Sequence, residues 1–473
     1  MSNNKPAIVI DLDGTLIKTD LLIESFFSLI KKNPLYIIFA LFWLKKGKAN
    51  LKREIASRVN IPIETLPYND AVIQYVKEKQ QQGYITALAT ASNKKYADQV
   101  AEHLGIFDAV FASDDVINLS GSKKKAALNE AYGVKGYIYA GNAEVDTKVW
   151  QDSTAAVVVG GNALASQAEK ICGVDKHIPA EGGLLKKWLK ALRVHQWVKN
   201  GLVFVPLFAS HQSSDLEKIV LCIAAFCAFS LCASSVYLLN DLLDLNDDRR
   251  HRTKRNRPFA AGSVNLLHGL LLAPLLLVVA FIIAAGVSLD FLTVLACYYV
   301  LTFAYSFYLK RVELVDVITL AGLYTIRIIA GAAAISVVLS FWLLAFSIFV
   351  FLSLALVKRF TEVLDLRGKV QKKALGRGYD ARDIELLSSL GGSSGYISVL
   401  ILALYINSED VKILYSEPMI MWPICLVVLF WVSRVWIVAH RGQMNDDPIV
   451  FALKDKASIL CGVIIAGFML FAA

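Results

Sequence analysis

The sequence predicts an α/β (Rossmannoid) domain fused to an all-α polytopic membrane domain with nine transmembrane helices. The first observation is uneven hydrophobicity: the chain has 473 residues and a mean hydropathy of +0.51, and its long apolar runs begin only at about Trp197. The second is a short apolar run, residues 7–10, that leads directly into Asp11. Such a run is typical of a buried parallel strand whose carboxyl end carries a site.

Composition narrows the class of protein. The net charge is +9, but the basic residues lie mostly beside the apolar runs. This placement indicates membrane orientation and phosphate binding, and we expect no nucleic-acid partner. The spacing of the seven cysteines predicts neither a disulfide framework nor a zinc site. The first residues pass straight into a strand pattern, so no secretory signal is expected.

Three segments follow from these patterns. Residues 1–182 form the soluble domain, with a helical cap expected at about 16–69. Residues 183–196 alternate apolar and basic residues at helical spacing, which predicts an amphipathic linker on an anionic membrane face. Residues 197–473 form the membrane domain. Its spans are expected at 197–210, 217–240, 266–287, 290–309, 314–335, 338–357, 394–408, 418–438 and 457–473.

The soluble domain carries four short motifs in order. Asp11 and Asp13 follow the first strand, an arrangement typical of a nucleophile and an acid/base group. Thr90 lies at the end of a second strand pattern, and Lys124 lies in a basic stretch that begins at Gly121. Asp146 closes the fourth motif, which begins Gly141-Asn142.

These motifs resemble those of the haloacid dehalogenase (HAD) phosphohydrolases. The resemblance implies that Asp11 is phosphorylated, that Asp13 protonates the leaving group, and that Thr90 and Lys124 bind phosphate. It also implies that Asp11, Asp13 and Asp146 hold Mg²⁺. The family normally has Gly-Asp where this chain has Gly-Asn, and an amide is a poorer Mg²⁺ ligand than a carboxylate. Phosphatase activity and a retained scaffold without activity therefore both stay open.

The cap region contains an apolar stretch, residues 33–44, followed by Lys45, Lys46 and Lys48. The stretch is too short to span a bilayer. The first interpretation is an ordinary buried cap helix. The alternative is an interfacial helix that leans on the membrane and receives a lipid-linked phosphate.

An aspartate-rich segment, residues 240–262, lies between two apolar runs. Asp241, Asp244 and Asp248 share one face if the helix continues through them. Their hard oxygens suit Mg²⁺, which typically bridges carboxylates to substrate phosphates. The cations and histidine that match phosphate oxygens here are Arg249, His251, Lys254 and Arg257. A solvated loop with positive-inside charge explains the basic residues but not the spaced carboxylates.

The pattern N-D-x-x-D-x-x-x-D-R-x-H-x-x-K-x-x-R-P-x-A-x-G resembles the first aspartate-rich motif of the UbiA superfamily of membrane prenyltransferases. It most resembles the decaprenyl-phosphate phosphoribosyltransferase-like subgroup. The resemblance implies Mg²⁺ on the three aspartates. Further candidates for phosphate binding are Lys199, Asn240, Lys310, Arg327, Lys358 and Arg359. Positive-inside charge remains the alternative for Lys358 and Arg359, and a structural ion pair for Arg327.

The expected function is Mg²⁺-dependent transfer of 5-phosphoribose from phosphoribosyl diphosphate to polyprenyl phosphate, with the HAD domain dephosphorylating the product. The alternative is transfer of a polyprenyl chain from its diphosphate to an aromatic acceptor, with a degenerate HAD domain. The second D-x-x-x-D motif of the aromatic enzymes is missing after the sixth span. Loop charge predicts a multi-pass protein of the inner (cytoplasmic) membrane, with the N-terminal domain and both sites facing the cytoplasm and the C-terminus outside. Besides the substrates and the lipid bilayer, a homo-oligomer is left open.

Overall fold

The computed structural model describes residues 6–114, 117–180, 182–366, 378–409, 411, 415–444 and 447–472. They fold into two compact units, each with its own hydrophobic core. Unit 1 comprises Met1–Leu192 and Tyr237–Ala273, and unit 2 comprises Arg193–Val236 and Pro274–Ala473.

Unit 1 contains a six-stranded sheet in which every neighbouring pair of strands is parallel, in the order β3-β2-β1-β4-β5-β6. The strands are β1 (Ala7–Ile10), β2 (Ile85–Asn93), β3 (Ala109–Ser113), β4 (Tyr137–Gly141), β5 (Ala155–Gly160) and β6 (Val174–Pro179). Val9 of β1 lies opposite Ala87 on one side and Tyr139 on the other. The strand order reverses at β1, so its carboxyl end is the switch point at which open α/β sheets place their sites.

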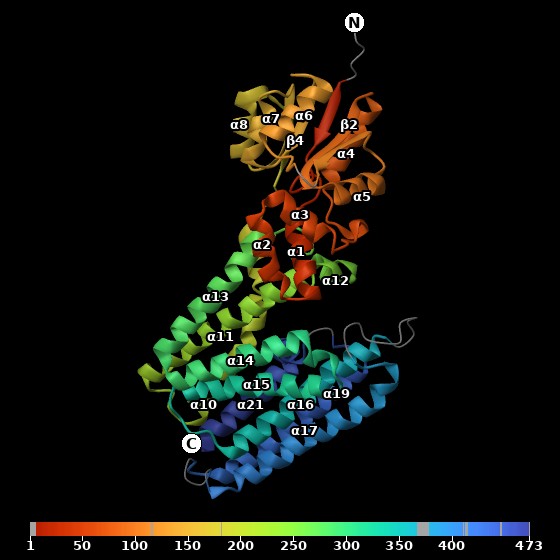
Figure 1. The fold of residues 1–473 in the computed structure, drawn as a ribbon. Coiled ribbons are helices and arrows are strands. Elements are labelled where there is room, and N and C mark those ends of the chain that lie inside the picture. Colours follow the sequence, from red (N-terminus) through yellow and green to blue (C-terminus); the bar gives the residue numbers. More distant parts are fainter. Residues whose placement is uncertain are drawn as a thin grey trace. The chain divides into compact units, whose positions relative to one another are not determined.

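Helices cover both faces of this sheet (Figure 1). Successive side chains of β1 alternate between the faces. Ile8 and Ile10 pack with the residues of α4 and α5, whereas Ala7 and Val9 pack with those of α6, α7 and α8. These helices are α4 (Asp70–Gln81), α5 (Lys94–Leu104), α6 (Ser122–Tyr132), α7 (Thr147–Trp150) and α8 (Asn162–Cys172). The predicted α/β fold is confirmed.

Three helices form the insertion between β1 and β2: α1 (Leu21–Lys32), α2 (Tyr36–Lys45) and α3 (Lys48–Ala56). The side chain of Asp20 caps α1 by accepting hydrogen bonds from the backbone N–H groups of Leu22 and Ile23. In α2, Ala40 is the only buried residue. The first interpretation of this stretch, a buried cap helix, is therefore wrong. The amphipathic stretch before the membrane part forms α9 (Leu184–Ala191).

Seven helical segments among the described residues are long and apolar enough to cross a membrane. They are α11 (Leu216–Leu243), α13 (Leu266–Val287), α14 (Leu289–Phe307), α15 (Val315–Ala334), α16 (Phe341–Leu364), Ala381–Ile406 with α17 (Ile384–Ile406), and Pro418–His440 with α19 (Trp422–His440). Nine spans are not confirmed. The predicted first span forms the 3₁₀ helix η3 (Val194–Phe204) and the short α10 (Val205–Ala209). The predicted last span forms α21 (Lys456–Ala472), whose 17 residues reach only about 25 Å, against a hydrocarbon core of about 30 Å.

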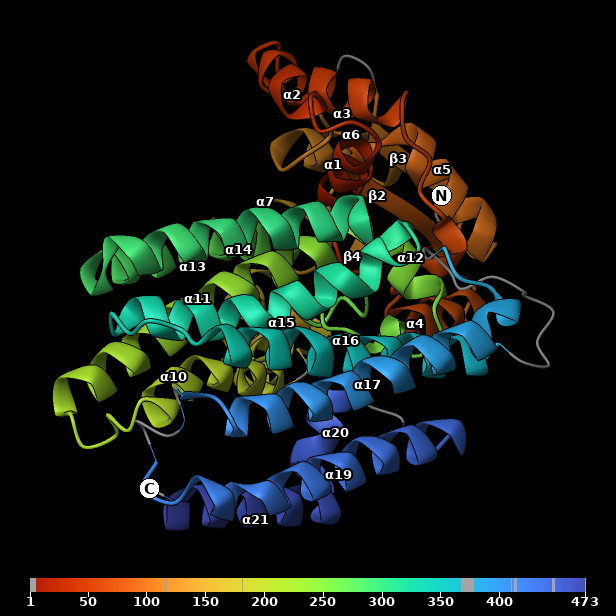
Figure 2. The ribbon, with the colours of Figure 1, turned by 90° about the horizontal axis from the view of Figure 1, so that it is seen from below.

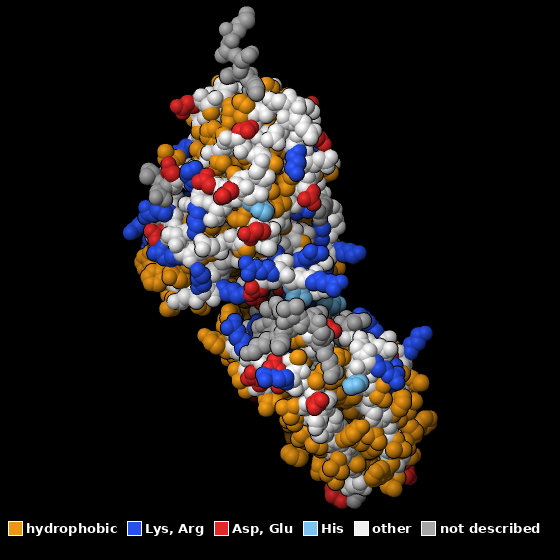
Figure 3. Space-filling view, turned by 90° about the vertical axis from the view of Figure 1, so that its right-hand side faces the viewer, with side chains coloured by type: hydrophobic (Ala, Val, Ile, Leu, Met, Phe, Trp, Pro, Cys, Tyr) orange, Lys and Arg blue, Asp and Glu red, His pale blue; other side chains and the backbone are white. Residues whose placement is uncertain are grey.

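In unit 2, helices α14, α15, α16, α17, α19 and α21 pack each against the next (Figure 2). Hydrophobic side chains cover much of the outer surface of this helical body (Figure 3). Close packing of α17 depends on glycine: a Cβ at Gly395 would lie 2.4 Å from Cγ1 of Val432. Apolar surface facing outward and small residues between helices are both expected of a body that sits in lipid.

Candidate active sites in the two units

The motif residues of the soluble half meet at the carboxyl end of β1. Lys124 Nζ lies 2.7 Å from Oδ1 of Asp11, and both side chains are almost buried. Ser92 and Thr90 donate to Oδ2 of Asp13 at 2.6 and 3.3 Å. The structure therefore brings together the predicted Asp11, Asp13, Thr90 and Lys124. Ser92 was not predicted, because one hydroxyl was chosen from a stretch that carries two.

Both carboxyl groups titrate far from their ordinary range. Burial raises the pKa of Asp11 to about 6; Lys124 opposes this rise and Asp146 adds to it. Burial also raises the pKa of Asp13 to about 7, and the charge of Asp20 adds to it. Burial is thus the main cause that raises both pKa values. Raised carboxyl pKa values are typical of catalytic sites.

Asp146 of the fourth motif forms hydrogen bonds that hold the loop following β4. Oδ1 of Asp146 accepts a hydrogen bond from the Tyr139 hydroxyl at 3.0 Å, and Oδ2 accepts one from the backbone N–H of Asn142 at 3.0 Å. Oδ1 of Asn142 accepts from Thr15 at 3.1 Å. Gly14 has a φ of +78°, and a Cβ there would lie 2.2 Å from Nδ2 of Asn142. Glycine is therefore required where the first and fourth motifs meet.

The donor set at this sheet edge fits Mg²⁺ in chemistry, because carboxylate and amide oxygens are the ligands that hard cations prefer. Asp11 and Asp13 supply the carboxylates, and Asn142 stands where the family has a third. Among the described residues, no three acidic, histidine or cysteine side chains are grouped for a metal ion. Asp146, which the sequence placed in this set, is instead engaged by Tyr139 and the backbone.

The aspartate-rich segment also lies in unit 1. Helix α11 ends at Leu243, and α12 (Leu245–Arg250) follows after a one-residue interruption at Asp244. Arg257 Nη1 lies 3.1 Å from Oδ1 of Asp241 and 2.7 Å from Oδ2 of Asp248. Both carboxylates are nearly inaccessible to solvent. Two of the three predicted aspartates therefore converge on one cation.

Asp244 has other partners, because helix α1 of the cap packs against this segment. Lys31 Nζ lies 2.6 Å from Oδ1 of Asp244. Arg249 donates from Nη1 and Nη2 to the two carboxylate oxygens of Glu24 at 2.7 and 2.6 Å, and from Nε to the carbonyl of Ala260 at 2.9 Å. The Arg249 and Glu24 side chains are 3% and 1% exposed. Arg249, which was predicted to bind phosphate, thus joins the cap to the aspartate-rich segment.

Two further predicted residues, His251 and Asn240, lie in this segment, and Lys310 lies in unit 2. Nδ1 of His251 lies 3.4 Å from the backbone nitrogen of Lys254, the first residue of the 3₁₀ turn η4 (Lys254–Asn256). Asn240 precedes Asp241 on α11. Lys310 lies in another short turn, η5 (Leu309–Arg311), in unit 2.

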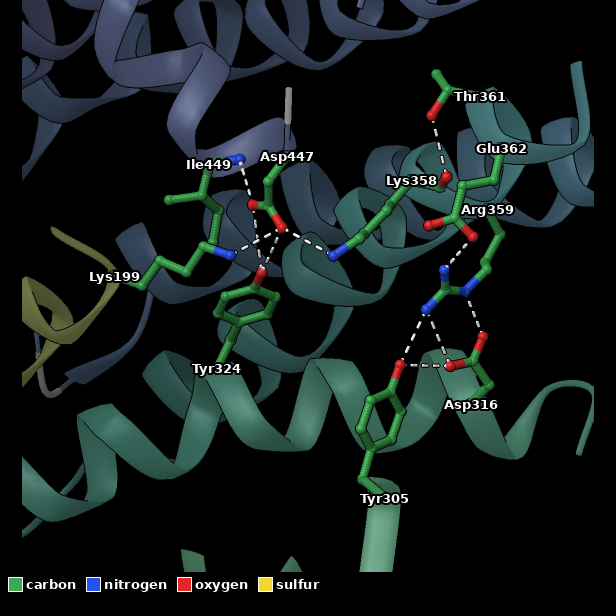
Figure 4. A network of polar contacts seen from close by, with 10 residues as sticks. All are labelled: Lys199, Tyr305, Asp316, Tyr324, Lys358, Arg359, Thr361, Glu362, Asp447 and Ile449. Carbon is green, nitrogen blue, oxygen red and sulfur yellow. Dashed lines mark hydrogen bonds and ion pairs between the residues drawn. The ribbon is translucent and has the colours of Figure 1, made fainter. Parts of the chain in front are cut away.

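In unit 2, two predicted lysines share one carboxylate (Figure 4). Lys199 Nζ and Lys358 Nζ lie 2.8 and 3.0 Å from Oδ2 of Asp447. The Tyr324 hydroxyl lies 3.4 Å from each carboxylate oxygen. Asp447 was not predicted, since it lies just before α20 (Pro448–Lys454) with no pattern to mark it.

Arg359 lies in a second part of the same close-up (Figure 4). Its guanidinium bonds both oxygens of Asp316 and one of Glu362, and it donates to the Tyr305 hydroxyl at 2.9 Å. The Tyr305 hydroxyl in turn donates to Asp316 at 2.7 Å. The Arg359 and Asp316 side chains are fully enclosed. This geometry favours a structural ion pair for Arg359, an interpretation that the sequence had not assigned to it.

Arg327 differs from Arg359 in the charge of its partners. It is 4% exposed, donates to Oδ1 of Asn200 at 2.9 Å and to the Tyr298 hydroxyl at 3.1 Å, and lies 5.6 Å from the centre of the Tyr324 ring. No carboxylate lies within ion-pair distance of it in the part of the chain that the structure describes. The structural ion pair expected as an alternative for Arg327 is therefore not found. A buried cation with only neutral partners is a candidate for an anionic ligand.

The fold defines an integral membrane protein with an HAD-like half and a helical half. A family model described as the UbiA prenyltransferase family matches residues 202–453. The chain belongs to this family and is a UbiA-family transferase.

Relatives agree over different lengths of the chain. An uncharacterized protein, y4nM, of Sinorhizobium fredii is 36% identical over 467 residues, which are 98% of this chain and 90% of that one. A decaprenyl-phosphate phosphoribosyltransferase of Mycolicibacterium smegmatis is 35% identical over 300 residues, 62% of this chain and 92% of that one.

Solved structures show weaker likeness. A UbiA homolog from Archaeoglobus fulgidus bound to DMAPP and Mg²⁺ covers 60% of this chain and 97% of its own, with 17% identity and a TM-score of 0.47. A substrate-bound phosphoserine phosphatase covers 37% of this chain and 94% of its own, with 15% identity and a TM-score of 0.27.

Proposed function

We propose that the membrane half transfers 5-phosphoribose from phosphoribosyl diphosphate to polyprenyl phosphate, at the cytoplasmic face of the inner membrane. The carrying observation is surplus positive charge in unit 2. Among the described residues, Lys199 and Lys358 share the single carboxylate of Asp447, and the nearby Arg327 has neutral partners. A buried cation is costly unless an anion pairs with it. Phosphoribosyl diphosphate and polyprenyl phosphate both carry phosphate groups that can pair with these cations. The phosphoribosyltransferase relative supports this choice.

We assign the metal to the aspartate-rich segment of unit 1. Asp241 and Asp248 are buried, and their oxygens already converge on one cation, Arg257. They fit Mg²⁺, and we keep the neighbouring Asp244 in the set. When bound, Mg²⁺ would offset the negative charge of the diphosphate leaving group. Lys254 and Arg257 add positive charge of their own for the same phosphates.

The transfer step balances without a redox partner. An oxygen of the lipid phosphate forms a bond to the anomeric carbon of the ribose. The bond from that carbon to the diphosphate oxygen breaks, and diphosphate leaves with the electron pair. The lipid product keeps the 5-phosphate of the ribose as a phosphomonoester.

We assign removal of this 5-phosphate to the HAD half. The Asp11 carboxylate attacks phosphorus, while Asp13 gives its proton to the leaving ribose oxygen. Water then hydrolyses the aspartyl phosphate. Lys124, at 2.7 Å from Asp11, is placed to balance charge on the phosphoryl group.

A lipid-product assay tests the transferase proposal. Purified protein with Mg²⁺ receives phosphoribosyl diphosphate and polyprenyl phosphate, and in a parallel reaction prenyl diphosphate and an aromatic acid, with products read by mass spectrometry. We expect a phosphoribosylated lipid, together with the ribosylated lipid that the HAD half makes from it, and both are lost in Asp248→Asn. Asp247→Asn is the matched control. It removes the same charge from the neighbouring residue, whose side chain is exposed. A prenylated aromatic product instead would establish the alternative function.

A further inference from the structure

Helix α2 of the cap presents an apolar face to its surroundings. Ile38, Leu41 and Phe42 are 54%, 61% and 58% exposed. The opposite face is anchored, since the Arg58 guanidinium lies 4.8 Å from the centre of the Trp43 ring. The helix is therefore held firmly by one side while the other side lacks cover within unit 1.

The sequence that flanks α2 is basic. From residue 25 to residue 53 the sequence contains no aspartate or glutamate. The basic residues of this stretch are Lys31, Lys32, Lys45, Lys46, Lys48, Lys52 and Arg53. An apolar helical face flanked by basic residues is the pattern of a helix that lies in the interface of an anionic membrane.

Contacts inside unit 1 place α2 near the end of a membrane span. Lys31, in the last turn of α1, lies 2.6 Å from Asp244, and Ser28 of α1 accepts a hydrogen bond from Asn246 at 3.0 Å. Asp244 directly follows Leu243, the last residue of the apolar helix α11. Helix α2 begins at Tyr36, only five residues after Lys31. The start of α2 therefore lies within five residues of a contact with the carboxyl end of the apolar helix α11.

The same cap adjoins the phosphatase site. The backbone N–H of Leu21, the first residue of α1, donates to Oδ1 of Asp13 at 2.8 Å. From α3, Lys52 donates to the carbonyl of Ala91 at 2.6 Å, next to Thr90. Helix α2 joins α1 to α3 in the chain. Both of its neighbouring helices therefore contact residues of the phosphatase site.

We propose that α2 is a membrane-interface helix whose partner is the anionic lipid surface, and that it presents the HAD site to a lipid-linked phosphomonoester. Its second part rests on the phosphatase function proposed above. The membrane is the partner that apolar exposure, the basic flanking sequence and attachment to α11 all favour. A second copy of the chain meeting at α2 is the competing occupant, and the experiment below distinguishes the two.

The location of α2 is measured on the full chain in nanodiscs that contain anionic lipid. A genetically encoded fluorescent residue replaces Leu41, and in a separate protein it replaces Val134, which is exposed in the same unit but lies outside the cap. We expect lipids with a nitroxide near the headgroup to quench position 41 at least threefold more than position 134. Equal quenching overturns the proposal. Shielding at position 41 without quenching, increasing with two copies per disc, assigns the face to a second copy and also overturns it.

The functional part is measured with Leu41→Glu combined with Phe42→Glu. We expect at least a tenfold loss of kcat/KM on a polyprenyl-linked phosphomonoester in vesicles, and less than a twofold change on soluble p-nitrophenyl phosphate. Val134→Glu is the control and keeps both activities. Equal loss on both substrates overturns the presenting role. If the unmodified protein hydrolyses neither substrate, the phosphatase function and the presenting role fall together, while the quenching result still decides where α2 lies.

Discussion

Glu24→Gln is expected to weaken the transferase reaction even though Glu24 belongs to the HAD half. Its carboxylate holds Arg249 through two hydrogen bonds of 2.7 and 2.6 Å, in an ion pair that is closed to solvent. Removing one charge of such a pair leaves the other buried without compensation, which costs about 3–5 kcal/mol. For a domain of this size, about 2–4 °C is lost per kcal/mol. The melting temperature of unit 1 should therefore fall by roughly 6–20 °C.

The assay follows thermal unfolding and phosphoribosyl transfer of the same purified protein in detergent. Lys31→Met is the matched control: it breaks a pair on the same helix whose side chains are 35% and 31% exposed, and such pairs contribute about 0–1 kcal/mol. Glu24→Leu with Arg249→Met should recover part of the stability, because apolar replacements of a buried pair leave no isolated charge. The reasoning is refuted if Glu24→Gln is no more damaging than Lys31→Met, or if transfer continues at the unmodified rate.

Two further predictions separate the halves. Asp13→Asn should lower hydrolysis of the lipid-linked phosphomonoester at least about 100-fold, as expected for loss of a general acid. Transfer should stay intact, so mass spectrometry should find that the phosphorylated lipid accumulates. Unchanged hydrolysis would remove Asp13 from the mechanism. Arg327→Met should raise KM for phosphoribosyl diphosphate by about 10-fold or more, as a lost charged hydrogen bond of about 1.5–3 kcal/mol implies, and Arg327→Lys should recover part of it. If Arg327→Lys raises KM as much as Arg327→Met does, the charge of Arg327 does not bind the substrate, and Arg327 is a structural residue.

Sequence reasoning succeeded where chemistry is tied to local structure. Asp11 and Asp13 follow a strand that a four-residue apolar run marks clearly, and parallel strands bring their carboxyl ends to one edge. Thr90 was found in the same way, in the carboxyl half of β2, which ends at Asn93. The spacing of the aspartates predicted that three of them share one helix face; the helix is interrupted at Asp244, and only Asp241 and Asp248 share a partner, Arg257.

Partner choice across long distances was beyond sequence reasoning. Glu24 and Arg249 are separated by 225 residues, and Lys358 and Asp447 by 89. A charge pattern shows that cations are present but not which carboxylate folds against each of them. Arg249 and Arg327 illustrate this limit: both were assigned to phosphate, yet the fold gives the first a buried carboxylate and the second neutral partners.

The charge balance around each lysine explains why the two halves require different help in binding phosphate. Lys124 faces Asp11 in a one-to-one pair, with Asp13 nearby, so an incoming phosphate meets no surplus of positive charge from these residues. A divalent cation supplies that surplus, which is the physical reason to expect Mg²⁺ at the HAD site. Around Asp447 the ratio is reversed, since Lys199 and Lys358 share it. Counted over the described residues, one positive charge there remains for an anion even before a metal ion takes part.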